Sequence, residues 1–247
     1  MLNIWTIAKK EYKAYFNSFT AYLFAFFILL VIGGVVIVSL LSAITGFGSI
    51  PPPGVQVVTG PLIFMLIFAC PAFTMRLISE ETRLGTMELL LTAPVRDVEL
   101  VVGKWLGSFL FVLTLIAISW VYPIILNFIT EPGIDQGPLV TGYIGLALVS
   151  AAFLAIGVAV SSWFGNQVAS YITAFGIIVL FWFVVGILGQ SASGSMASVF
   201  QYMNMSSHYY DSMYRGVIQL SSVVYYLSFT VAALVLGSVS VESRRWR

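Results

Sequence analysis

Six long apolar stretches separated by short polar segments dominate the pattern along this sequence. They run near residues 21–43, 57–75, 104–129, 139–163, 168–189 and 218–241. Each is long enough to cross a bilayer as a helix, which takes about 20 residues. None alternates like a half-buried strand, and a helix satisfies its own backbone groups in lipid. The pattern therefore predicts an all-α membrane protein with six transmembrane helices.

The composition supports lipid as the main solvent of the chain. Apolar residues make up 60% of the sequence and charged residues only 9%, against about 25% charged in soluble domains. The net charge of +1 does not decide whether nucleic acid is bound, but no long basic run is present and we expect no nucleic-acid partner. With one Cys and one His in the whole chain, we expect no metal site.

The basic residues predict the orientation. If the N-terminus is cytoplasmic, every Lys and Arg except Arg215 falls on the inner side, as the positive-inside rule requires. Both termini are then cytoplasmic. Before the first span, the apolar residues recur at helical spacing: Ile4, Ile7, Ala8, Tyr12, Tyr15 and Phe19. This predicts an amphipathic helix in the headgroup plane with its lysines toward anionic lipid. A plain positive anchor would show the same charges.

A charged loop lies between the second and third spans. Residues 76–104 contain nine of the 21 charged residues. Gly85 permits a sharp turn, Thr86 can cap a helix whose first turn holds Glu88, and Pro94 would end it. Such a helix would expose three leucines beside the charges, as a small docking surface does. The alternative is a loop that packs on its own helix ends and carries solvated charge.

The segment 190–217 is too polar to span the membrane. Its apolar residues fall about four apart, which predicts a short interfacial helix near the outer leaflet: Tyr202, Met205, Tyr209, Met213 and Val217. The other outer loops are short turns. His208 and Asp211 stand there without further ligands, so we interpret His208 as an ordinary interfacial histidine.

No catalytic set is present in the sequence. Gly103-Lys104 lacks the other residues of a phosphate-binding loop, and no serine stands in a Gly-x-Ser-x-Gly motif. Acidic or basic residues are absent from the span centres, which argues against an ion-coupled transporter. We therefore expect a protein that is not an enzyme and receives energy from a partner.

The charged loop also carries a family resemblance. The residues from Pro71 to Val95 (PAFTMRLISEETRLGTMELLLTAPV) and Glu99-Leu-Val-Val-Gly-Lys resemble ABC-2 type transporter permeases. The chain looks closest to the gliding-motility GldF-like group, with the NosY-like permeases as relatives. Further segments that fit the same group are residues 152–158, 162–167, 210–218 and 242–246. The likeness covers essentially the whole chain.

This resemblance implies a single ABC-2 transmembrane domain over residues 1–247, similar to type V exporters. Two permease chains would pair, each seated on a cytoplasmic ABC ATPase. The loop 76–103 would carry a coupling helix over Glu81–Ala93, and residues 164–167 a second contact. The implied coupling residues are Glu81, Arg83, Gly85, Thr86, Glu88, Leu89, Leu90, Leu91, Pro94, Phe164, Gly165, Asn166 and Gln167. The segment 190–217 would fold partly back into the outer leaflet and offer a substrate path along Tyr202, Tyr209, Tyr210, Asp211 and Arg215.

The implied function is the permease subunit of an ABC exporter in the bacterial inner membrane, moving a hydrophobic or amphiphilic substrate. ATP and Mg²⁺ would bind the partner ATPase, and this chain would need no cofactor. Because the outer loops are short, any large extracytoplasmic domain would belong to an auxiliary subunit. The alternative is a membrane scaffold or mechanotransmitter that relays ATPase motion to an extracytoplasmic partner without transport.

Overall fold

The computed structural model describes residues 2–45, 54–86, 95–130 and 133–245. Within these ranges the regular elements are helical, and six helical stretches are long and apolar enough to cross a membrane. The prediction of six spanning helices is confirmed. The stretches are α2 (Phe19–Thr45); α3 (Gln56–Thr74) with α4 (Ser79–Arg83); α6 (Asp97–Ile118) with α7 (Val121–Ile129); α8 (Gln136–Trp163); α9 (Gln167–Val179) with the π-helical turn η1 (Leu180–Val184) and α10 (Val185–Ser191); and α13 (Leu220–Arg245).

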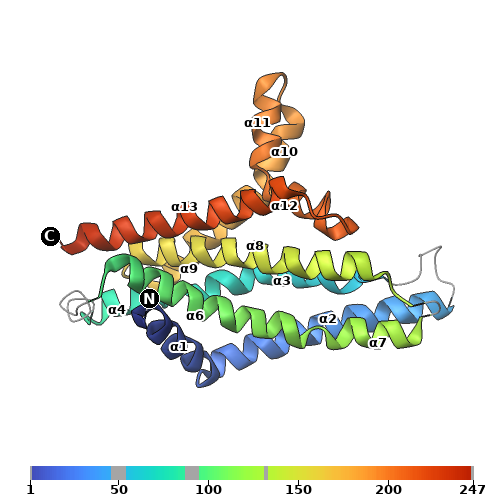
Figure 1. Cartoon of the computed structure of the whole chain (residues 1–247), viewed down its shortest axis with the longest axis horizontal. Coiled ribbons are helices and arrows are strands. Elements are labelled where there is room, and N and C mark those ends of the chain that lie inside the picture. Colours follow the sequence, from blue (N-terminus) through green and yellow to red (C-terminus); the bar gives the residue numbers. More distant parts are fainter. Residues whose placement is uncertain (1, 46–53, 87–94, 131–132, 246–247) are drawn as a thin grey trace.

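The spanning stretches run roughly alongside one another, except for α10 at the end of the fifth (Figure 1). The N-terminal helix α1 (Leu2–Phe16), the short helix α4 and the last turns of α13 lie at one end of the bundle. We call this the charged end. The last turn of α2, the first turn of α3 and helix α7 lie toward the opposite end. Both described ends of the chain therefore lie on the same side of the bundle, as six crossings require.

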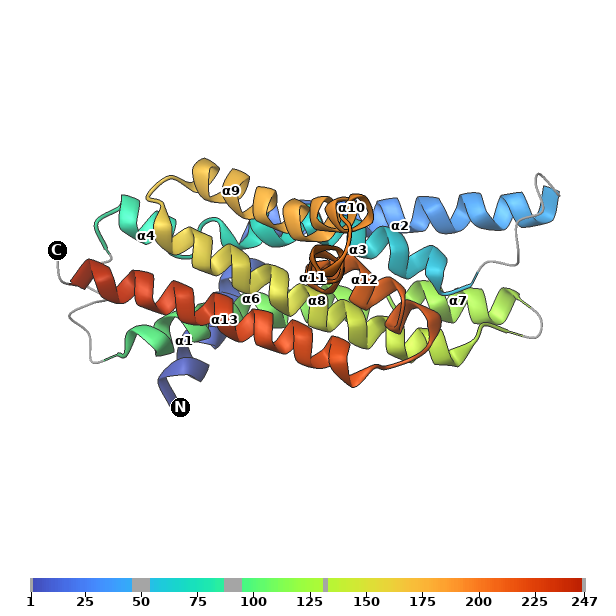
Figure 2. The same ribbon diagram turned by 90° about the horizontal axis from the view of Figure 1, so that it is seen from above.

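Helix α8 is the centre of the fold. It packs against α3, α6, α9 and α13, and Figure 2 shows it between α9 and α13. All of its residues from Val149 to Ser162 are buried, and many of them are small. Gly145 and Gly157 leave room for neighbours: a Cβ at Gly145 would lie 2.8 Å from Met213 Sδ, and one at Gly157 would collide with Thr74. Small residues at such positions let membrane helices approach closely.

The outward faces are apolar, as expected of surfaces in contact with lipid. Phe19, Phe26 and Phe128 are among the large side chains that are more than half exposed. Helix α2 is the least buried span and faces the bundle through a single stripe, which consists of Ala21, Ile28, Ile32 and Val36.

Besides the second stretch, which turns between α3 and α4, two more are interrupted. The third breaks at Ser119–Trp120. Pro123 follows four residues after Ser119, and a proline there can neither bond to the Ser119 carbonyl nor avoid clashing with it. The fifth span contains the π-helical turn over Leu180–Val184, which the sequence pattern did not predict.

The prediction of one short helix along residues 202–217 is wrong. The structure has three pieces instead: α11 (Ser195–Met203), α12 (Met205–Tyr210) and the 3-10 turn η2 (Met213–Arg215). Asn204 ends α11, and its side chain then accepts a hydrogen bond from Ser206 N and caps α12. The four-residue spacing still marks a buried face, because Met205, Tyr209 and Met213 are fully buried. Helices α10 and α11 project away from the bundle (Figure 1).

Candidate functional site

The turn between α3 and α4 is fixed from α8. Ser161 Oγ accepts hydrogen bonds from Ile78 N at 3.0 Å and Ser79 N at 3.1 Å. The same hydroxyl donates to the Met75 carbonyl at 3.4 Å. Ser161 is fully buried, so no water replaces it. One side chain of the central helix therefore holds the start of the segment that the sequence assigned to coupling.

Replacing Ser161 with alanine is expected to lower the free energy of unfolding by about 1–3 kcal/mol, because two buried N–H groups lose their acceptor. Ser150 is the matched control on the same helix, since it is equally buried and bonds only to its own helix at Ala147. Thermal unfolding of the purified chain in detergent would measure both variants. Equal effects of S161A and S150A would contradict the capping role.

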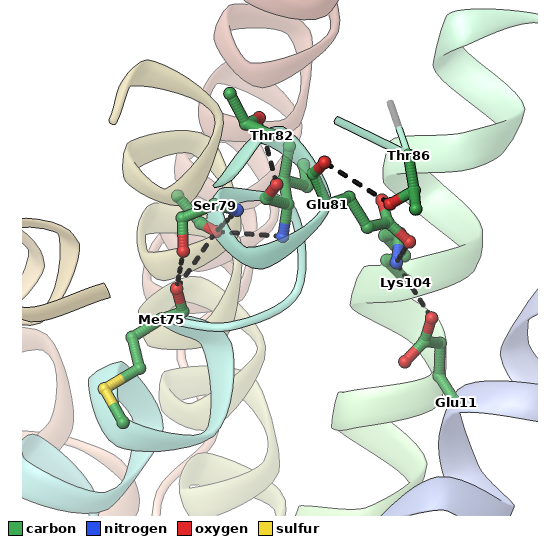
Figure 3. Close-up of polar contacts among 9 residues, drawn as sticks. Glu11, Met75, Ser79, Glu81, Thr82, Thr86 and Lys104 are labelled. Carbon is green, nitrogen blue, oxygen red and sulfur yellow. Dashed lines mark hydrogen bonds and ion pairs between the residues drawn. The ribbon is translucent and has the colours of Figure 1, made fainter. Parts of the chain in front are cut away.

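A buried ion cluster joins three helices at the charged end (Figure 3). Lys104 Nζ of α6 lies 2.8 Å from Glu11 Oε1 of α1 and 2.8 Å from Glu81 Oε1 of α4. The Lys104 side chain is only 4% exposed, and those of Glu11 and Glu81 are 17% and 22% exposed. A charge buried this deeply needs such partners, because removal from water is otherwise very unfavourable.

This cluster changes the role expected for Glu81. The sequence placed Glu81 on a surface that faces an ATPase, but its carboxylate turns inward to Lys104. Its second oxygen, Oε2, is buried and has no hydrogen-bond partner. The neighbouring Glu80 is the exposed carboxylate and pairs with Arg83 at 3.7 Å. Glu81 is thus positioned to tie α4 to the bundle.

Glu11 is the residue that sequence reasoning missed. It lies 93 positions from Lys104, so no local pattern connects the two. A signal was nevertheless available, because Glu11 is the only acidic residue before Glu80. A single carboxylate in a lysine-rich segment of an apolar chain marks a position with a specific partner.

Helix α1 packs closely against α6. A Cβ at Gly103 would lie 2.8 Å from Ile7 Cβ, and one at Gly107 would lie 2.8 Å from the Ala8 carbonyl oxygen. The two glycines are four apart, which is the spacing that allows close helix contact in membranes. Tyr15 adds a hydrogen bond of 2.8 Å to the Phe73 carbonyl. One side of α1 therefore packs on protein, while Lys9, Lys10 and Lys13 stay exposed. That these lysines face anionic lipid stays a prediction.

A cavity of about 270 Å³ lies between α1, α2, α3 and α4. Its apolar wall includes Tyr15, Phe24 and Phe73, and its polar end includes Arg76 and Glu81. The ion cluster therefore borders an open space, which leaves room for α4 to shift against α1.

The two segments predicted to contact an ATPase lie together. Residues 164–167 connect α8 to α9, and Gly165 faces Thr82 of α4, since a Cβ there would lie 3.7 Å from Thr82 Cγ2. Asn166 caps α9 by accepting a hydrogen bond from Val168 N at 2.9 Å. Phe164 packs against the core, and Gln167 begins α9.

The end of α4 agrees in part with the predicted local structure. Gly85 has a φ of +71°, as a sharp turn requires. The Thr86 hydroxyl bonds backward to the Glu81 carbonyl at 3.3 Å (Figure 3). Arg83 is exposed beside it. The helix expected after Thr86, with Glu88, Leu89, Leu90, Leu91 and Pro94, lies outside the described residues.

The residues proposed for an outer substrate path differ in their burial. Tyr209 is fully buried beside Gly145 and lines no open surface, which corrects that assignment. Burial also raises the pKa of its hydroxyl. Tyr210 is half-buried, while Tyr202 is exposed. Asp211 and Arg215 form an exposed pair at 3.5 Å, a kind of pair that contributes little.

His208 is held by its neighbours. Its Nε2 lies 2.9 Å from the Tyr202 carbonyl, and its ring stacks on Tyr225 with centroids 4.1 Å apart. Among the described residues no group of three or more His, Cys, Asp or Glu side chains could hold a metal ion.

These features define the class of protein. Six helical stretches are long and apolar enough to cross a membrane, which makes this a multi-pass membrane protein. At its charged end, ion pairs connect α4 to α1 and α6, and Ser161 connects it to α8. A family model described as ABC-2 family transporter protein matches residues 52–241. The chain therefore belongs to the ABC-2 family of transporter membrane proteins, whose members pair with an ABC ATPase. A comparison with curated proteins finds no match.

Proposed function

We propose that this protein is the permease subunit of an ABC exporter of the GldF-like and NosY-like group in the bacterial inner membrane. The charged end and both termini would face the cytoplasm, where α4, residues 84–94 and the connection 164–167 contact the partner ATPase. ATP and Mg²⁺ would bind that partner, and a second permease chain would complete the transporter. The observation that carries the proposal is the ion cluster that ties α4 to α1 and α6.

The contacts of α4 explain how ATPase motion could reach the spans. A displacement of α4 that broke both Lys104 ion pairs would leave charges buried without partners, which is strongly unfavourable. Helices α1 and α6 are therefore expected to move with α4. Ser161 extends the connection to α8, and α8 packs on α13 and α9. A displacement of α4 by the ATPase would therefore change how α1, α6 and α8 pack against their neighbours.

Hydrophobic or amphiphilic substrates fit this architecture. The spans expose apolar and aromatic side chains, and such surfaces adapt to many ligands. The outer end of a substrate path would involve Tyr202, Tyr210, Asp211 and Arg215, which remain at least partly exposed.

One observation favours the alternative of a mechanotransmitter. Helices α10 and α11 project from the bundle (Figure 1) and expose Met196, Val199 and Tyr202. Because they project sideways from the bundle, across the direction of the spans (Figure 1), an auxiliary subunit would reach them through a membrane segment of its own. Purified complex in liposomes would separate the two functions: substrate-stimulated ATPase activity with measured translocation supports export, and ATPase activity without translocation of any amphiphile tested supports the alternative.

Replacing Leu89, Leu90 and Leu91 together with aspartate is expected to abolish co-purification with the partner ATPase, because apolar anchors dominate small interfaces. The control is Val217→Asp, an exposed position in the segment just before α13, and the first turn of α13 lies far from α4 in Figure 1. Pull-down from cells that express both subunits would measure the effect. Undiminished pull-down and ATPase stimulation by the leucine variant would refute the docking role.

A further inference from the structure

A groove with a volume of about 600 Å³ runs between α1 and α6, separate from the cavity beside α4. Helix α6 supplies an apolar wall from Leu110, Leu113 and Ala117. Helix α1 supplies Trp5, Lys9 and Lys13. The ion cluster and the contacts proposed for an ATPase do not use these residues.

The two lysines stand on one stripe of α1, four residues apart and in line with Trp5. Both are exposed. Among the described residues, neither ammonium group has a carboxylate within ion-pair distance. Lys10 has different surroundings, because it lines another pocket together with the acidic residues Glu11 and Asp97. The groove thus combines two cations at its rim with a hydrocarbon wall and a tryptophan, a residue enriched where membrane meets water.

We propose that this groove binds an anionic phospholipid from the leaflet in which α1 lies. The phosphate group would be held between Lys9 and Lys13, and an acyl chain would lie along Leu110, Leu113 and Ala117. The groove's position decides the class of occupant. Its wall is part of a membrane-spanning helix, so the ligand must place hydrocarbon at that depth and negative charge at the surface. A phospholipid meets both requirements, and basic residues at such interfaces attract anionic headgroups.

The proposal does not depend on export. It requires only that the chain lies in a membrane. The bound lipid would connect the amphipathic helix to the third span on the side opposite the ion cluster, and α1 would thereby be held to α6 by protein contacts on one face and by lipid on the other.

Native mass spectrometry of the full-length chain, titrated with phosphatidylglycerol or phosphatidylcholine, tests the site. The wild type is expected to retain phosphatidylglycerol preferentially. The double variant K9Q/K13Q should weaken phosphatidylglycerol binding by about 30-fold, which is about fivefold for each lysine at about 1 kcal/mol per basic residue. Lys10→Gln makes the same charge change on the same helix and is expected to have a much smaller effect. Leu113→Trp, which fills the groove, should weaken phosphatidylglycerol binding with all three lysines present.

Three results would overturn the proposal. Equal retention of the two lipids by the wild type would show no recognition of charge. Equal losses from K10Q and from single K9Q or K13Q variants would show that only the overall charge of α1 matters. Unchanged binding by L113W would show that the groove is not where the lipid lies.

Discussion

The replacement of Lys104 by methionine is expected to lower the free energy of unfolding by about 3 kcal/mol, the lower end of the range for removing one partner of a buried ion pair. The lower end applies because Glu11 and Glu81 keep some exposure to solvent. The variant leaves two carboxylates facing each other without a cation, and one oxygen of Glu81 has no partner even in the native protein. Thermal unfolding in detergent measures the effect, with exposed Lys10→Met as the control.

A compensated variant separates stability from coupling. The triple replacement E11M/E81M/K104M exchanges all three charged side chains for hydrophobic ones of similar size, and replacing a buried ion cluster by well-packed hydrophobic residues is often neutral for stability. Stability is therefore expected to recover. The directional bonds from α6 to α1 and α4 are lost, however, so ATPase-driven activity of the complex should stay low. Recovery of both stability and activity would show that the cluster only maintains the fold, and a stable K104M would show that the ion pairs contribute little.

The spans could be predicted from sequence because lipid imposes a simple rule. A chain that crosses hydrocarbon must satisfy its backbone internally, so a long uncharged run such as that of α2 has essentially one solution. The rule says nothing about contacts between helices. The ion pair between Glu11 and Lys104 joins positions 93 residues apart. The hydrogen bond between Ser161 and Ile78 joins positions 83 residues apart. The sequence placed the candidate site in the loop 76–103, which stays a prediction, and it did not foresee the buried contacts of Lys104 and Ser161.

The segment 190–217 shows how spacing alone can mislead. The four-residue period from Met205 to Met213 marks a face that packs inward, whereas Tyr202 is exposed. It also favoured one continuous helix, whereas Asn204 offers its side chain to the backbone and starts a new one. Asparagine competes for backbone groups in this way and is common at helix starts. The cap at Asn204 therefore ends one helix and starts another despite the regular spacing. Tyr209 lies in the second of these helices and is buried in the core.

Helix α1 is expected to be displaced when Gly107 becomes alanine. The new Cβ would lie 2.6 Å from Glu11 Cβ and 2.8 Å from the Ala8 carbonyl oxygen. Neither of these atoms can swing away as the end of a flexible side chain could, so the whole helix must shift. Overpacking of this kind lowers the free energy of unfolding by about 1–3 kcal/mol. Because Glu11 moves with α1, the ion pair to Lys104 is expected to lengthen in the same variant.

Gly176→Ala is the matched control, because it makes the same change inside a spanning helix with no atom within 4 Å of the new Cβ. Alanine favours helix over glycine by about 1 kcal/mol, so the two variants should change the unfolding temperature in opposite directions. The displacement itself can be detected with a cysteine at Ala8, which is fully buried, since a maleimide should label it in the G107A background but not in the native one. Equal labelling in both backgrounds, together with an unfolding temperature for G107A at or above that of the native chain, would mean that α1 does not depend on the glycine pair for its place on α6.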